Sequence, residues 1–159
     1  LSGATLYPLQ RDEAGRRALV AESLLTMSSI LASTIEDRFA AYHGDCIEVV
    51  SGLPSDSVHF SVYSPPFASL YTYSNSPRDM GNCSGQEEFF EHFAHLTAEL
   101  FRVLKPGRLM AVHCMNLPTS KARDGIIGIS DFRGNLIRAY EAAGFVYHSE
   151  VCIDRKSVV

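Results

Sequence analysis

Residues that could do chemistry follow a short stretch of alternating apolar and polar side chains. Residues 58–63 (Val-His-Phe-Ser-Val-Tyr) alternate with the period of a β-strand, and Ser64-Pro65-Pro66-Phe67 follows directly. Neither proline can donate a backbone hydrogen bond, and the residue before a proline is pushed toward extended geometry. We therefore expect Ser64 to be held stiffly at the carboxyl end of a strand, with Phe67 just beyond it.

These four residues suit a planar group that carries an exocyclic amine, such as the edge of a nucleobase. Ser64 has a hydroxyl, the two prolines have carbonyl oxygens that no helix uses, and Phe67 offers a flat apolar face for stacking. A plain Pro-Pro turn beside a half-buried phenylalanine is the alternative. The tetrapeptide alone does not decide between the two.

Ser64-Pro65-Pro66-Phe67 after an apolar strand resembles the catalytic motif of the amino-group DNA methyltransferases, (Asp/Asn/Ser)-Pro-Pro-(Tyr/Phe/Trp). Serine at its first position is typical of the N4-cytosine branch, whereas Asp or Asn is commoner in the N6-adenine branch. The flanking sequences over residues 40 to 153 are similar to that family as well: His43-Gly44-Asp45-Cys46, Leu53-Pro54, Asp56-Ser57-Val58 and Leu104-Lys105-Pro106-Gly107-Arg108-Leu109.

The resemblance implies an α/β, Rossmann-like three-layer methyltransferase sandwich that uses S-adenosylmethionine and double-stranded DNA. It assigns catalysis to Ser64, Pro65, Pro66 and Phe67, which would hold the exocyclic amine of a flipped base, N4 of cytosine ahead of N6 of adenine. It also assigns Asp45 to the adenine of the cofactor, with help from the backbone N–H of Cys46. From the residues alone, Asp45 is equally an N-cap for a short helix over 46–51, and one carboxylate can serve both roles.

One motif of the family is absent from the sequence. No F-x-G-x-G run, the loop that wraps the methionine end of the cofactor, occurs in the 159 residues. In one subgroup of the family this loop lies near the C-terminus, after the catalytic motif. We therefore expect the chain to be the catalytic half of such an enzyme, with the loop on a missing C-terminal half or a partner chain. A degenerate, non-catalytic binding module is the alternative.

Six further residues are candidates for contacts with DNA. Tyr71, Tyr73 and Asn75 lie in the polar loop after Phe67 and could line a base pocket. Three basic residues could reach backbone phosphates: Arg78, Lys121 and Arg123. For each of the six, a solvated or mobile surface position is the alternative.

Composition limits the class of protein. The 159 residues are 46% hydrophobic and 20% charged, as in an ordinary globular domain, and contain no apolar run of about 18 residues and no signal peptide. The four cysteines lie far apart, and His92 and His95 have no further ligands nearby, so we expect a reduced, cytoplasmic protein without metal. The resemblance to the amino-group DNA methyltransferases implies a prokaryotic or phage origin. A net charge of −4 argues against a large phosphate-binding surface.

Two regions are expected along the chain. Residues 1–38 form an N-terminal helical extension, because apolar residues recur at helical spacing from about 12 to 35, and residues 39–159 form the catalytic part. In the second region we expect strands over 39–42, 58–63, 108–114 and 145–153, helices over 46–51, 84–104 and 131–144, and loops over 68–83 and 115–130. Alternating strands and helices indicate parallel connections.

Overall fold

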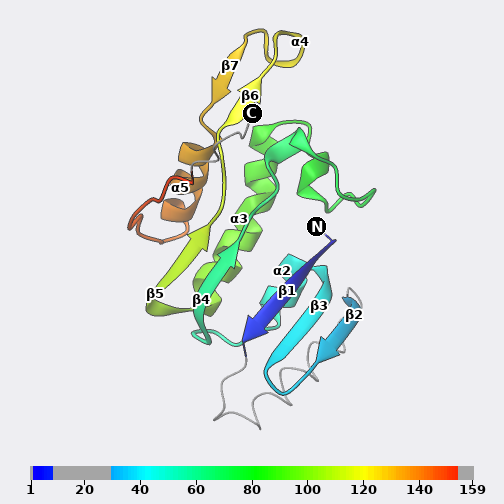
Figure 1. Ribbon diagram of the computed structural model, residues 1–159, viewed down its shortest axis with the longest axis vertical. Helices are drawn as coiled ribbons and strands as arrows, with labels where there is room; N and C mark the ends of the chain where they lie inside the picture. Colours follow the sequence, from blue (N-terminus) through cyan, green and yellow to red (C-terminus); the bar gives the residue numbers. More distant parts are fainter. Residues whose placement is uncertain (1, 9–29, 154–159) are drawn as a thin grey trace, which may run out of the picture.

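A parallel strand pair joined by a long helix forms the centre of the fold (Figure 1). The computed structural model describes residues 2–8 and 30–153. Strand β4 (Val58–Tyr63) pairs in parallel with β5 (Leu104–Val112), and helix α3 (Gln86–Val103) connects them. Because parallel strands end at the same edge of a sheet, the residues that follow β4 and β5 lie side by side. The parallel connection expected here is confirmed.

A second, antiparallel sheet departs from the expectation for the N-terminal region. It has β3 (Phe39–Asp45) at its centre, flanked by β1 (Ser2–Pro8) and β2 (Ile30–Ile35). Most of the helix expected over 12–35, residues 12–29, lies outside the described residues. Its last six residues are a strand, because pairing with β3 favours the β-branched side chains of this segment over their helical spacing. The division of the chain at residue 38 stays a prediction.

The main core lies where α3 meets α5 (Phe132–Ala142). One face of α3 is apolar and buried, and it packs with the buried side chains of α5 in one cluster: Phe89, Phe93, Leu96, Leu100, Phe132, Leu136 and Tyr140. Asp131 caps α5, since its Oδ1 accepts from Gly134 N at 3.0 Å. At the start of α3 the Glu88 carboxylate accepts from Ser84 N at 2.7 Å.

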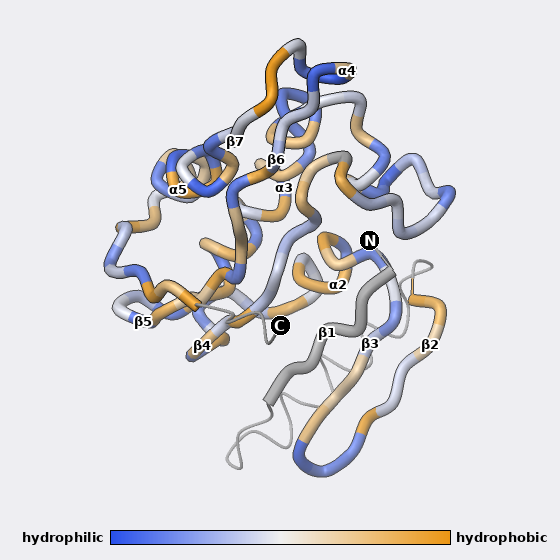
Figure 2. The backbone as a smooth tube through the Cα atoms, turned by 45° about the horizontal axis from the view of Figure 1, so that its top comes forward, coloured by the Kyte–Doolittle hydropathy of each residue, from blue (hydrophilic) through white to orange (hydrophobic). Residues whose placement is uncertain are grey.

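A hairpin replaces the loop expected over 115–130. Strands β6 (Leu117–Thr119) and β7 (Gly128–Ser130) pair antiparallel, with the short helix α4 (Lys121–Asp124) between them. Ser120 caps α4, and Gly125 ends it with a φ of 75°, a left-handed conformation that favours glycine. Figure 2 shows the apolar residues of the tip between α4 and β7. Local capping and strand pairing therefore fold this segment, although its polar sequence predicts a loop.

The strand expected over 145–153 is not formed. This segment has no regular secondary structure, and among the described residues β5 is paired with β4 alone. Phe145 nevertheless packs against the buried cluster between α3 and α5 and against a second buried cluster, which contains residues of β3 and α2. A strand needs a neighbour to accept its backbone hydrogen bonds, so the apolar character of this segment is insufficient to define one.

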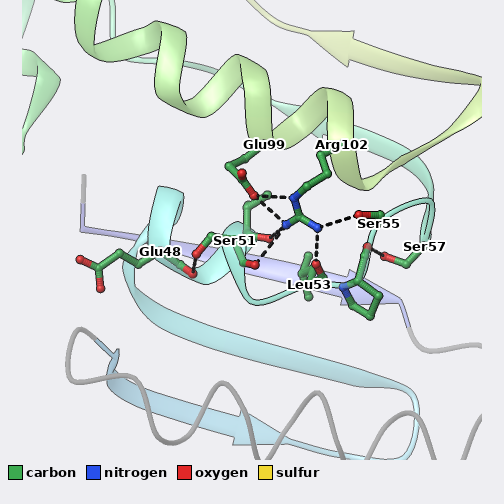
Figure 3. A network of polar contacts seen from close by, with 9 residues as sticks. Glu48, Ser51, Leu53, Ser55, Ser57, Glu99 and Arg102 are labelled. Atoms are coloured by element: carbon green, nitrogen blue, oxygen red, sulfur yellow. Dashed lines mark hydrogen bonds and ion pairs between the residues drawn. The ribbon is translucent and has the colours of Figure 1, made fainter.

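Helix α2 (Cys46–Ser51) follows β3, as expected, and Arg102 ties it to α3 (Figure 3). Its guanidinium donates to the carbonyls of Leu53 at 2.8 Å, Val50 at 3.2 Å and Ser51 at 3.1 Å, and pairs with Glu99 at 2.6 Å. A planar fork of five donors suits such a set of acceptors, which an ammonium group cannot reproduce. The end of α3 is thereby fixed against the turn that leads into β4. No described helix is both long and apolar enough to cross a membrane.

Candidate active site

Ser64 lies at the edge where the two parallel strands end. His113, one residue after β5, donates its backbone N–H to the Tyr63 carbonyl at 2.9 Å and so extends the ladder. Ser64 Oγ donates in turn to the His113 carbonyl at 3.0 Å and lies 3.4 Å from His113 Nδ1. Because the hydroxyl proton is directed at a carbonyl, the exposed Ser64 oxygen keeps lone pairs with which to accept a hydrogen bond.

The rest of the motif follows β4 directly. Pro65 and Pro66 are buried, and no described residue donates to the Pro65 carbonyl. The half-buried ring of Phe67 meets Phe132 edge-on, with centroids 6.4 Å apart, and the His113 ring is tilted against it at 6.4 Å. A hydroxyl, a free carbonyl and an aromatic ring therefore follow one another at the strand end, while their roles in catalysis stay predictions.

Asp45 lies at the end of β3 and caps α2. Its Oδ1 accepts from Ile47 N at 2.9 Å, so the N-cap role is present, and its Oδ2 lies 3.3 Å from Arg78 Nη1. A carboxylate has about four lone-pair sites, so acceptor capacity remains for a ligand. Next to it, burial and the charge of Asp45 raise the pKa of the Cys46 thiol to about 11, which keeps the thiol neutral.

The cofactor and catalytic candidates border the same core. Cys46, Tyr63 and Phe67 all pack against the buried cluster between α3 and α5. The hydroxyl of Tyr63 shares a hydrogen bond with that of Tyr140, and burial raises both phenolic pKa values, so neither group is charged. The residue that follows Asp45 and the residues on both sides of Ser64 therefore pack against the same buried cluster.

A buried carboxylate that the sequence analysis missed organises the loop after Phe67. Asp79 is 1% exposed, and it accepts from the backbone N–H groups of Tyr73 at 3.0 Å, Ser74 at 2.6 Å and Gly81 at 2.9 Å. Burial alone would raise the pKa of Asp79, but these donors hold it below its usual value. Two 3₁₀ turns, η1 (Ala68–Leu70) and η2 (Met80–Asn82), flank this network. The Asp-x-Gly spacing at 79–81 is typical of an Asx turn and could have identified Asp79 from the sequence.

The six candidate DNA contacts are not gathered in one place. Tyr71 and Tyr73 are exposed, with ring centroids 6.5 Å apart, and Asn75 is exposed nearby in sequence. The Arg78 guanidinium is bound by Asp45 and Glu48, which raises its pKa, so a phosphate would have to compete with two carboxylates. The remaining two, Lys121 and Arg123, lie on α4 in the hairpin.

A pocket of about 250 Å³ separates the segment after Phe67 from the hairpin. Ala68 and Leu70 line one side, Gln86 lies at the start of α3, and the hairpin contributes Leu117 and Thr119. Thr119 Oγ1 is buried and has no hydrogen-bond partner among the described residues. Within residues 2–8 and 30–153, no three His, Cys, Asp or Glu side chains are grouped to hold a metal ion.

Comparison with known proteins places the fold. No protein-family model and no curated protein matches the chain. Two solved structures of TTHA0409 from Thermus thermophilus, a "Putative DNA Modification Methylase", are similar to it. The selenomethionine derivative has a TM-score of 0.50 at 20% identity, over 70% of this chain and 46% of that one. The complex with S-adenosyl-L-methionine has a TM-score of 0.52 at 22% identity, over 70% and 47%.

At this level of identity the likeness concerns the fold. The mixed α/β arrangement of this chain is similar to part of a methyltransferase-like structure. The chain spans less than half the length of that protein, 46% to 47%.

Proposed function

We propose that this chain carries the base-holding part of a Rossmann-like, amino-group DNA methyltransferase that methylates N4 of cytosine. The observation that carries the proposal is the Ser64 hydroxyl: its proton is donated to the His113 carbonyl, so its exposed oxygen is an acceptor beside the Phe67 ring. The structural likeness to TTHA0409 supports the same class of reaction.

The chain's own residues would hold the amine and orient it. A duplex hides the exocyclic amine, so the base must be flipped out and stacked on Phe67, a contact of about 1–3 kcal/mol per base. Ser64 Oγ and the Pro65 carbonyl would accept the two amine N–H groups, which directs the nitrogen lone pair away from both oxygens. Catalysis then rests on positioning and on preformed acceptors.

S-adenosylmethionine supplies an activated methyl group when bound. Asp45 fits as an acceptor for the adenine or ribose of that cofactor, because its carboxylate keeps unused lone pairs beyond those that cap α2 and contact Arg78. The structure of TTHA0409 was solved in complex with this molecule. Since the sequence lacks an F-x-G-x-G run, the methionine end would be held by a segment outside these 159 residues, and we expect weak binding by this chain alone.

Serine at position 64 favours cytosine through the resemblance rather than through geometry. An outward-facing oxygen acceptor suits the N4 amine of cytosine and the N6 amine of adenine equally. N6-adenine methylation is therefore the second candidate. Either reaction would take place in the cytoplasm of a prokaryote or of a phage-infected cell.

The test is methyl transfer from labelled cofactor to duplex DNA, followed by digestion to nucleosides. The cofactor is supplied up to millimolar levels, because weak binding is expected. We expect N4-methylcytosine from the wild type and from Phe67→Tyr, which keeps the stacking face, and a loss of about tenfold or more in Phe67→Ala. N6-methyladenine as the sole product would overturn the cytosine assignment. Absence of any methylated nucleoside would overturn catalysis by these 159 residues alone and leave the binding module and an enzyme completed by a second segment.

A further inference from the structure

The hairpin Leu117–Ser130 exposes three isoleucines that the proposed chemistry does not use. Ile126, Ile127 and Ile129 are 64%, 84% and 75% exposed. Ile126 and Ile127 lie at the tip between α4 and β7, and Ile129 lies in β7, where the chain projects beyond α3 and α5 (Figures 1 and 2). Clustered apolar side chains on a projecting surface mark an interaction site more often than isolated ones do.

The tip stands on a well-anchored base. Leu117 is buried in the main core, and Ser130 Oγ accepts from Gln86 Nε2 at 2.8 Å. Above it, Asp124 accepts from Ser120 N at 2.7 Å and closes the turn of α4. Because the hairpin is fastened to α3 and capped internally, the isoleucines are held outward by folded structure.

Cationic side chains flank this apolar tip. Lys121 is exposed and forms no ion pair within the described part of the chain. Arg123 pairs with Asp124 at 3.1 Å and donates to the Pro118 carbonyl at 2.9 Å, so a phosphate would have to compete with these two acceptors for its guanidinium. An apolar wedge flanked by cations suits duplex DNA, in which bases can be unstacked by the wedge while phosphates meet the cations.

The hairpin also lies next to the candidate active site. Strand β5 ends at the same edge as β4, and β6 begins only five residues after β5. The pocket of about 250 Å³ joins the hairpin to Ala68, the residue after Phe67. Thr119 of the hairpin also lines this pocket. The segment that follows the Ser64 motif and the hairpin therefore border one pocket.

We propose that the hairpin Leu117–Ser130 is a DNA wedge: Ile126 and Ile127 enter the base stack beside the flipped nucleotide while Lys121 and Arg123 contact the flanking phosphates. The inference rests on the proposed action on DNA, but not on methyl transfer itself. A small contact of this kind agrees with the chain's net charge of −4, because most of it is apolar.

The experiment measures binding and unstacking without cofactor. The probe is a short fluorescein-labelled duplex with one mismatched cytosine, which is cheap to flip, flanked by 2-aminopurine, which brightens when it is unstacked. We expect the wild type to bind and to raise the 2-aminopurine signal. Ile126→Ala/Ile127→Ala should bind about tenfold more weakly, or about 1.4 kcal/mol, and lose that signal. Lys121→Gln should keep the signal at saturation and lower the salt slope by about one.

The matched control is Leu31→Ala, which shortens an aliphatic side chain of similar exposure, 73%, on β2. It should behave as the wild type, and circular dichroism melts should show all variants folded. The wedge is overturned if the double variant binds and unstacks DNA like the wild type, or if the wild type raises no signal. It is likewise overturned if the isoleucine variant changes only self-association in sedimentation, which would mark a contact between copies.

The two proposals fail separately. Hairpin-dependent unstacking without any methylated nucleoside would overturn methyl transfer and leave the wedge. Methyl transfer that is unchanged in the double isoleucine variant, at the same KM for DNA, would overturn the wedge and leave the enzyme.

Discussion

Removing the charge of Asp79 should loosen the loop that follows the Ser64 motif. The Asp79 carboxylate accepts three backbone N–H groups and the Ser74 hydroxyl, the last at 3.2 Å. In Asp79→Asn the amide can keep its oxygen toward Tyr73 and Ser74, but its NH₂ then faces the buried N–H of Gly81. An unpaired buried donor costs about 1–3 kcal/mol, so we expect a loss of about 2 kcal/mol, and about 3 kcal/mol for Asp79→Ala.

Urea unfolding followed by circular dichroism measures this loss, since the chain has no tryptophan. Amide hydrogen exchange should rise over residues 71–82 before it rises elsewhere, because the network is local. Glu91→Gln, which neutralises an exposed carboxylate on α3, is the matched control and should leave both measurements unchanged. If Asp79→Asn costs less than about 0.5 kcal/mol and leaves exchange in the loop unchanged, the carboxylate does not hold the loop.

The effect of pH has a definite sign. The pKa of Asp79 is lowered in the folded state, so its stabilising contribution is complete above the unfolded value of about 3.9 and is lost as the pH falls through the folded pKa. The difference in unfolding free energy between wild type and Asp79→Asn should therefore shrink in acid. A difference that stays constant down to the acid transition would contradict this assignment.

Three further substitutions test the packing around the site. Gly81→Ala would place a Cβ 2.2 Å from a backbone carbonyl of the same loop, so we expect a loss of about 2 kcal/mol or more in urea unfolding. Tyr63→Phe or Tyr140→Phe should each cost about 1–3 kcal/mol by leaving one buried hydroxyl unpaired, and the double variant should cost less than the sum in a double-mutant cycle. Arg102→Lys should lower the Tm by several degrees, because one ammonium cannot reach three carbonyls and a carboxylate.

Features that depend on neighbouring residues could be predicted from the sequence. The Asp45 cap of α2 appears in the structure, and α3 and α5 lie within the ranges expected for them, 84–104 and 131–144. The strand before Ser64 is also present, because its alternation and the two prolines act within a few residues. The position of His113 beside Ser64 could not be predicted in this way. The two residues are 49 positions apart in the chain, and the pairing of β4 with β5 brings them together.

Features that depend on distant partners were missed. The segment 30–35 has apolar residues at helical spacing, but β3 offers it a strand partner, and its β-branched residues fit that sheet. The hairpin over 117–130 contains too few apolar residues in alternation to signal two strands, and its structure comes from the Ser120 cap and the left-handed Gly125. Local patterns predict elements well only where no distant partner competes for the segment.

The two faces of β4 show a further limit of periodicity. In β4 the apolar residues Phe60 and Val62 alternate with Ser61 and Tyr63. The simplest prediction from this pattern is that Phe60 and Val62 are buried. In the structure Phe60 is 52% and Val62 69% exposed, while the Tyr63 hydroxyl is satisfied on the buried face by Tyr140. A strand whose apolar and polar residues alternate is typical of a sheet with one buried face, and in β4 the described residues cover the face of Tyr63. Alternation thus distinguishes the two faces of β4, but which face is buried depends on the elements that pack against it.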